Sequence, residues 1–107
     1  MSCNKMRAIH PGEILKEEFM IPLNLSSTKL AKSISVPTNR ITSIINGTRS
    51  ITGDTAIRLS LYFGTTPDFW MNLQKAYEIR KAEMDFDETI RDNILSKSIS
   101  NLQNISA

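Results

Sequence analysis

The chain has 107 residues and a mass of 12.1 kDa, the size of one domain or of one domain with a tail. Of its residues 40% are hydrophobic and 22% are charged, so we expect a folded protein with a modest core. No hydrophobic run is longer than three residues, which predicts neither a membrane span nor a secretory signal. Cys3 and His10 are the only residues of their kinds, which argues against a disulfide, a zinc finger and a Cys-His or Ser-His catalytic pair. The composition therefore favours a cytoplasmic binding protein without a metal or other cofactor over an enzyme.

The net charge of +2 is small but unevenly distributed. Residues 1–50 carry seven Lys and Arg against three Glu, whereas residues 51–107 carry six Lys and Arg against eight Asp and Glu. No acidic residue lies between Glu18 and Asp54, and that interval contains four basic residues, Lys29, Lys32, Arg40 and Arg49. A basic segment without carboxylates suits a polyanion, because a carboxylate there would repel phosphate. A solvated surface with a chance asymmetry would give the same pattern, so charge alone does not decide.

The first helix is predicted to begin at Pro11, with Glu13 in its first turn, and to end at Pro22. Four apolar residues recur there at helical spacing, namely Ile14, Leu15, Phe19 and Leu23. Ser26 or Ser27 is expected to cap the second helix. The apolar face of that second helix consists of Leu30, Ala31 and Ile34.

Pro37 is expected to open a third helix that closes at Gly47, a residue suited to the left-handed conformation beyond a helix end. Its apolar residues are Ile41, Ile44 and Ile45. A fourth helix is predicted to be capped by Thr52 or Asp54 and to stop at Gly64. Its inward side chains are expected to be Ile57, Leu61 and Tyr62 or Phe63.

Thr66 followed by Pro67 predicts the start of a fifth helix that runs to about Lys81. Its apolar side chains are Phe69, Trp70, Leu73, Ala76 and Tyr77. Residues 87–95 could form a short frayed helix, and residues 96–107 are expected to be a mobile tail. Because no useful stretch alternates with a period of two, strands are not expected. The fold class is therefore all-α, a compact bundle of five helices with a weakly structured C-terminal extension.

The segment from Ser27 to Asn46 meets the steric requirements of a helix-turn-helix. Ala31 is small where the two helices approach each other, while Ser35 occupies the turn position that usually carries Gly and costs about 1 kcal/mol in a left-handed conformation. The outward side chains of the second motif helix are Thr38, Asn39, Arg40, Thr42 and Ser43. None is acidic, and such a face fits the major groove of DNA, where Asn reads adenine and Arg reads guanine. Small helical domains also use this geometry for packing alone.

Several motifs together resemble the HigA antitoxins of the Xre-type helix-turn-helix group, which includes proteins labelled virulence-associated protein I. They are Ile9-His10-Pro11-Gly12-Glu13-Ile14-Leu15, Asn39-Arg40-Ile41, Ile45-Asn46-Gly47-Thr48-Arg49-Ser50-Ile51-Thr52, Asp54-Thr55-Ala56-Ile57-Arg58-Leu59, Tyr62-Phe63-Gly64 and Phe69-Trp70-Met71-Asn72-Leu73-Gln74. The resemblance covers residues 7–81 and implies a lambda-repressor-like domain at 9–84, between an N-terminal extension (1–8) and a C-terminal tail or short helix (85–107). It also implies an antitoxin of a type II toxin–antitoxin module that neutralises a HigB-type mRNA-cleaving toxin and, as a homodimer, represses its own operon.

The resemblance also implies which residues form the site. The expected contacts to base edges are Thr38, Asn39 and Ser43, followed by Arg40 and Thr42. The expected contacts to phosphates are Ser27, Lys29, Asn46, Thr48 and Arg49. The aromatic residues Phe69, Trp70 and Tyr77 are interpreted as core or dimer contacts, and the segment from His10 to Glu13 is given a structural role.

The partners expected are double-stranded operator DNA, a HigB-type toxin and a second copy of the chain, and no membrane. Two rival hypotheses remain open. One is a stand-alone Xre-type transcriptional repressor without a toxin, and the other is a protein-interaction adaptor that kept the fold without binding DNA. Absence of salt-sensitive DNA affinity would favour the adaptor.

Overall fold

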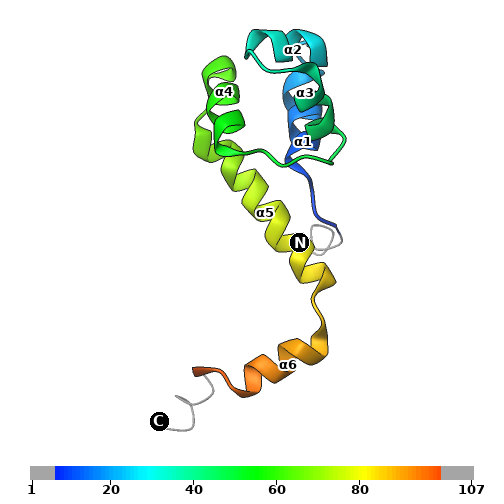
Figure 1. Cartoon of the computed structure of the whole chain (residues 1–107), viewed down its shortest axis with the longest axis vertical. Coiled ribbons are helices and arrows are strands. Elements are labelled where there is room, and N and C mark those ends of the chain that lie inside the picture. The colour runs from blue at the N-terminus through cyan, green and yellow to red at the C-terminus, as the bar shows by residue number, and fades with distance from the viewer. Residues whose placement is uncertain (1–6, 100–107) are drawn as a thin grey trace.

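The computed structural model describes residues 7–99, so part of the expected N-terminal extension (1–8) and of the expected C-terminal tail (85–107) lies outside the described residues. Across residues 7–99 all regular secondary structure is helical, as predicted. The helices are α1 (Pro11–Ile14), which continues into a π-helical segment (Leu15–Met20), α2 (Ser27–Ser33), α3 (Thr38–Ile45), α4 (Gly53–Phe63), α5 (Pro67–Asp85) and α6 (Glu88–Ser96). In Figure 1, α1 to α4 and the start of α5 form a globular body from which the rest of α5 and α6 extend.

Side-chain caps start five of these helices. Each supplies an oxygen or nitrogen atom to backbone N–H groups of a first turn, which have no partner inside the helix. The capping residues of α1, α2, α4, α5 and α6 are His10, Ser26, Thr52, Thr66 and Asp87. Of the alternatives left open by the sequence, Ser26 and Thr52 are therefore the caps.

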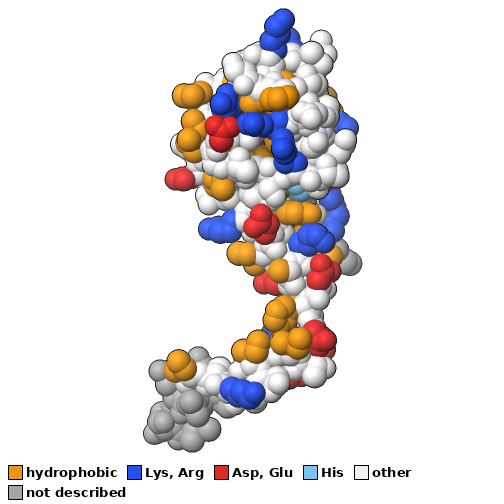
Figure 2. All heavy atoms as spheres, in the orientation of Figure 1, with side chains coloured by type: hydrophobic (Ala, Val, Ile, Leu, Met, Phe, Trp, Pro, Cys, Tyr) orange, Lys and Arg blue, Asp and Glu red, His pale blue; other side chains and the backbone are white. Residues whose placement is uncertain are grey.

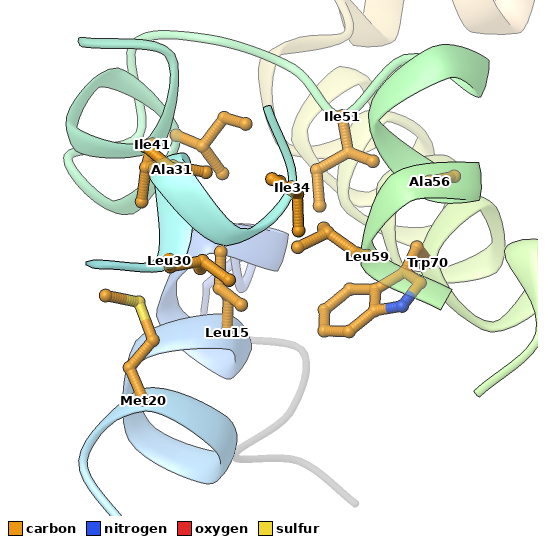
Figure 3. Close-up of a cluster of buried hydrophobic side chains, with 11 residues drawn as sticks. Leu15, Met20, Leu30, Ala31, Ile34, Ile41, Ile51, Ala56, Leu59 and Trp70 are labelled. Atoms are coloured by element: carbon orange, nitrogen blue, oxygen red, sulfur yellow. The ribbon is translucent and has the colours of Figure 1, made fainter. Parts of the chain in front are cut away.

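The hydrophobic core lies between α1 with its π-helical continuation, α2, α3, α4 and the start of α5 (Figure 3). It is formed by Leu15, Met20, Leu30, Ala31, Ile34, Ile41, Ile44, Ile51, Ala56, Leu59 and Trp70. The inward faces predicted for the second and third helices are confirmed, because all their residues are buried except Ile45, which is half-buried. Leu23, which follows Pro22, lies outside this core with 61% of its surface exposed.

The inward face predicted for α4 is wrong at Ile57 and Leu61, and of the alternatives Tyr62 and Phe63 it is Phe63 that packs against the core. Ile57, Leu61 and Tyr62 are 52%, 79% and 42% exposed. The residues that α4 buries are Thr55, Ala56, Leu59 and Ser60, and Phe63 is half-buried beside them. Two stripes of α4 carry apolar residues at helical spacing, and only the position of the neighbouring helices selects the stripe that contains Ala56 and Leu59.

The chain beyond the globular body is more helical than predicted. The fifth helix ends at Asp85 instead of near Lys81, and α6 covers the segment 87–95 for which the sequence allows a short helix. Together α5 and α6 lengthen the molecule to 59 Å, against 24 and 23 Å in the other directions. No residue of α6 is buried. This region exposes a set of apolar side chains that we call the C-terminal apolar face, namely Ile79, Met84, Phe86, Ile90, Ile94, Leu95 and Ile99.

Among residues 7–99, no helix has both the length and the apolar character needed to cross a membrane. The same residues hold no group of three or more His, Cys, Asp or Glu side chains placed to bind a metal ion.

Candidate nucleic-acid interface

The connection between α2 and α3 has the geometry of a helix-turn-helix. Ser35 has a φ of 61°, in the left-handed region, as the sequence predicts for this turn position. The N–H of Val36 donates to the carbonyl of Ala31 at 2.9 Å, which turns the chain sharply toward α3. Ala31 and Ile34 are buried beneath this turn, so the two helices are held at a fixed angle.

Helix α3 buries one face and presents the other. Ile41 and Ile44 have no exposed surface, while Thr38 and Asn39 are exposed at the start of the helix. The remaining candidates for base contacts are half-buried, namely Arg40, Thr42 and Ser43. No side chain caps the first turn of α3, so its leading N–H groups remain available to an acceptor such as a phosphate oxygen. The five predicted base-contact residues therefore share one helix, whose apolar side is fully occupied by the core.

The loop after α3 folds back onto that helix. Gly47 has a φ of 82°, the left-handed conformation predicted for it. The carbonyl of Ser43 accepts from the N–H groups of Thr48 and Arg49 at 2.9 and 3.2 Å, and from the Thr48 hydroxyl at 3.1 Å. Three of the predicted phosphate contacts, Asn46, Thr48 and Arg49, are consequently exposed next to the end of α3. The other two lie on α2, where Lys29 is exposed and Ser27 is half-buried.

His10 joins three parts of the globular body. Its Nδ1 atom accepts from the Gly12 N–H at 2.9 Å, it hydrogen-bonds the backbone of Arg49, and its ring meets the ring of Tyr77 at 4.8 Å. Burial lowers the pKa of His10, and the hydrogen bond to the Arg49 backbone opposes this effect only in part. The ring is therefore neutral at pH 7, and Nδ1 keeps the lone pair that caps α1. The rare His-Pro-Gly-Glu opening thus supports the loop that follows α3.

Gly12 is a point of close contact between α1 and α3. A Cβ atom at Gly12 would lie 1.8 Å from the carbonyl oxygen of Ile44 and 2.8 Å from the Cα of Ile45. Neither atom belongs to a flexible side chain, so only a residue without a Cβ fits this position. The sequence contains one hint of this contact, which is a glycine within the first turn of a helix.

Gln74 is a buried polar residue that the sequence analysis did not identify. It is 4% exposed, and its Oε1 accepts from the N–H of Ile51 at 2.8 Å, while its Nε2 donates to Glu78 at 2.9 Å. This side chain ties α5 to the loop between α3 and α4. Its position four residues after Trp70, on the buried side of α5, is the only sequence signal for this role.

Helix α4 brings a carboxylate to the segment that lacks acids in the sequence. Oδ2 of Asp54 accepts from Nη1 of Arg40 at 2.8 Å and from Nε of Arg58 at 2.9 Å. These hydrogen bonds, from Arg58 first and Arg40 second, lower the pKa of Asp54, so it is ionised at neutral pH. The spacing of four residues predicts the pair within α4, but the link to Arg40 depends on the tertiary structure. Figure 2 shows Lys and Arg side chains gathered on the globular body with acidic atoms among them.

The three aromatic candidates occupy different environments. Trp70 has no exposed surface, and its Nε1–H donates to the hydroxyl of Thr65 at 2.8 Å. Tyr77 is half-buried against His10, and Phe69 is 37% exposed. Trp70 therefore belongs to the core of its own chain, while Phe69 leaves part of its ring accessible.

A polar, surface-exposed helix presented by a second helix and a tight turn defines a helix-turn-helix protein. Comparison with family models agrees with this geometry, because the model described as helix-turn-helix matches residues 15–70. The chain therefore belongs to the helix-turn-helix family.

Three similar proteins place the chain within that family. Virulence-associated protein I of Dichelobacter nodosus is 50% identical over 82 residues, which are 77% of this chain and 76% of the relative. The solved structure of an addiction module antidote protein of the HigA family from Coxiella burnetii is 54% identical with a TM-score of 0.76, covering 81% of this chain and 95% of that one. The Pseudomonas aeruginosa antitoxin HigA, solved with the higBA promoter, is 40% identical with a TM-score of 0.75, covering 78% and 91%. The resemblance to the HigA antitoxins is thus confirmed.

Proposed function

We propose that the protein binds operator DNA through α3 and thereby represses its own operon in the cytoplasm. It acts by binding and not by catalysis. The observation that carries this proposal is the outer face of α3, which is polar, free of acidic residues and held outward by the fully buried Ile41 and Ile44. The P. aeruginosa HigA antitoxin was solved with the higBA promoter, which supports DNA binding here.

In this mode α3 lies in the major groove. Thr38, Asn39 and Ser43 contact base edges, with Arg40 and Thr42 beside them, and the phosphates on either side are bound by Ser27, Lys29, Asn46, Thr48 and Arg49. One such helix reads only a few base pairs. A homodimer with its two α3 helices about 34 Å apart reads two half-sites one turn of DNA apart.

The exposed C-terminal apolar face supports the homodimer. Its α6 residues Ile90 and Ile94 are 53% and 56% exposed, and exposed apolar side chains that gather on one region of a protein often mark a surface that binds another protein. Ile79 and Met84, on the far part of α5, are also exposed. Pairing of two copies there would leave α3 of each copy free for DNA.

Asn39 and Arg49 are expected to contribute differently to DNA binding. Substitution of Asn39 by alanine removes a base contact, so we expect affinity for the operator to fall by about 1–3 kcal/mol and sequence preference to weaken. Arg49→Ala removes a phosphate contact, so we expect weaker binding to every sequence and a shallower dependence on salt. Gel shifts on operator and scrambled DNA at several salt concentrations measure both effects.

Lys75→Ala is the matched control for this experiment, since it removes one exposed positive charge from α5. We expect it to leave sequence preference unchanged. If Asn39→Ala weakened binding to operator and scrambled DNA by the same factor, base reading by this face of α3 would be refuted.

We further propose that the protein is the antitoxin of a type II module and neutralises a HigB-type mRNA-cleaving toxin. The support is its similarity to HigA antitoxins. We expect that co-expression with the product of a neighbouring reading frame restores growth that this product alone arrests, and that the two proteins purify together. An Asn39→Ala variant should still restore growth, because we assign this face of α3 to DNA and not to the toxin.

Operator binding by a protein whose neighbouring reading frame has no effect on growth would instead identify a stand-alone repressor. A third outcome, absence of any salt-sensitive DNA affinity, would favour a protein-interaction adaptor that kept the fold without binding DNA.

A further inference from the structure

A line of hydrogen bonds connects the helix-turn-helix turn with the side chain of Arg40. Nη1 of Arg58 donates to the carbonyls of Ile34 and Ser35 at 2.8 and 3.2 Å, so α4 is hydrogen-bonded to the backbone of the turn between α2 and α3. Nε of Arg58 donates to Oδ2 of Asp54 at 2.9 Å, and the same oxygen accepts from Nη1 of Arg40 at 2.8 Å. The guanidinium of Arg40 is therefore anchored through Asp54 to a part of the backbone whose conformation is fixed.

A carboxylate such as that of Asp54 is unexpected beside α3. It is the first carboxylate after Glu18 in the chain, and a negative charge next to α3 weakens binding to phosphates. The side chains of Arg40 and Asp54 are 29% and 58% exposed, and ion pairs as exposed as this contribute little to folding stability. Asp54 also serves the fold, as the acidic residue in the first turn of α4 and as the partner of Arg58, but neither of these roles requires the additional contact with Arg40.

We propose that Asp54 is a positioning residue for sequence reading, which holds the guanidinium of Arg40 so that its remaining N–H groups meet a guanine in the major groove. The proposal rests on the proposed operator binding. Arginine has five N–H donors in a planar fork, and Asp54 occupies one of them. The O6 and N7 atoms of guanine accept two hydrogen bonds from such a fork.

The physical advantage of this arrangement is preorganisation. A free arginine side chain has many rotamers, and ordering it upon binding lowers the net affinity gained from its contact. Asp54 restricts Arg40 before DNA arrives, so less rotamer freedom remains to be lost in the complex. The restriction also fixes the direction in which the N–H groups of the guanidinium point. A fixed direction favours hydrogen bonds to a base edge over those to a phosphate, because a phosphate can be approached from many directions.

The test is selection of binding sites from random duplex DNA by the full-length protein and by its Arg40→Ala, Asp54→Ala and double variants. We expect both single variants to lose preference at the same one or two base pairs, by about tenfold in competition between the selected site and its G·C→A·T variant. We expect the double variant to show no greater loss than Arg40→Ala alone, because Asp54 acts through Arg40.

Asp68→Ala is the matched control, since Asp68 is likewise an exposed carboxylate at the second position of a helix, here α5. It removes the same charge at the same kind of position and should leave the base preference unchanged. Thermal unfolding of Asp54→Ala should resemble that of the unmodified protein, as expected for an exposed ion pair.

Two results would overturn the proposal while leaving operator binding intact. One is a uniform change in affinity for all sequences in Asp54→Ala, which would mean that Asp54 acts only as a charge. The other is an unchanged base preference in Arg40→Ala, which would place Arg40 on a phosphate. Failure of the unmodified protein to select any sequence would instead reject operator binding itself, and this proposal with it.

Discussion

Substitution of Gly12 by alanine is expected to destabilise the protein by about 3 kcal/mol, the upper end of the usual range for an overfilled core. The added methyl group would lie 1.8 Å from the carbonyl oxygen of Ile44, so α1 and α3 must separate to admit it. In a domain of this size such a loss lowers the midpoint of thermal unfolding by roughly 12–24 °C. Thermal and urea unfolding followed by circular dichroism measure it. Because α3 itself is displaced, the fraction that remains folded should also bind operator DNA more weakly.

Gly53 provides a matched control for this substitution. It is also a glycine at the start of a helix, but a Cβ atom there would meet no other atom within 4 Å. Gly53→Ala is therefore expected to be neutral or slightly stabilising, since alanine restricts the unfolded chain more than glycine does. Equal unfolding midpoints for the Gly12→Ala and Gly53→Ala variants would contradict the close contact between α1 and α3.

The second large effect is expected at Trp70, where substitution by alanine should cost about 3–5 kcal/mol. Trp70 is fully buried, and its ring lies 4.9 Å from the rings of both Phe19 and Phe69. Its removal leaves a cavity where α5 packs on the π-helical segment and α4. The free energy of unfolding, measured with urea, should fall by this amount, and such a loss is a large part of the stability of a small domain.

Two further variants separate the contributions of Trp70. Trp70→Phe retains an aromatic ring but removes the hydrogen bond to Thr65, so we expect a smaller loss that includes about 1 kcal/mol for this bond. Phe69→Ala, at the neighbouring and partly exposed position, should also cost less than Trp70→Ala. A loss at Phe69 as large as that at Trp70 would indicate that Phe69 is covered in solution, as in a dimer contact.

The starts and ends of the helices in the globular body were predictable because they depend on neighbouring residues in the chain. Thr66 followed by Pro67 starts α5 whatever lies around it, and Gly64 ends α4 with a φ of 77°. The left-handed Ser35 was predictable for the same reason, since the spacing of the two motif helices requires a sharp turn there.

Which side of a helix is buried was less predictable. For α3 the sequence offers one apolar stripe, and Ile41 and Ile44 lie in the core as expected. For α4 it offers two stripes, and the larger side chains, Ile57 and Leu61, are the exposed ones. Hydrophobicity ranks side chains but does not say where the neighbouring helices are, so the smaller Ala56 could not be recognised as the contact.

The candidate site likewise has features that the sequence predicts and features that depend on how the helices pack. Helical periodicity is enough to predict which helix presents the polar face, because the order of Ile41, Thr42, Ser43 and Ile44 sets the two sides of α3. The contacts that support this face depend on the tertiary structure: Gly12 against Ile44, Gln74 on the Ile51 N–H, and Asp54 on Arg40. The reason is that a helix is formed by interactions between residues a few positions apart, whereas these contacts join atoms that only the packing of separate helices brings together.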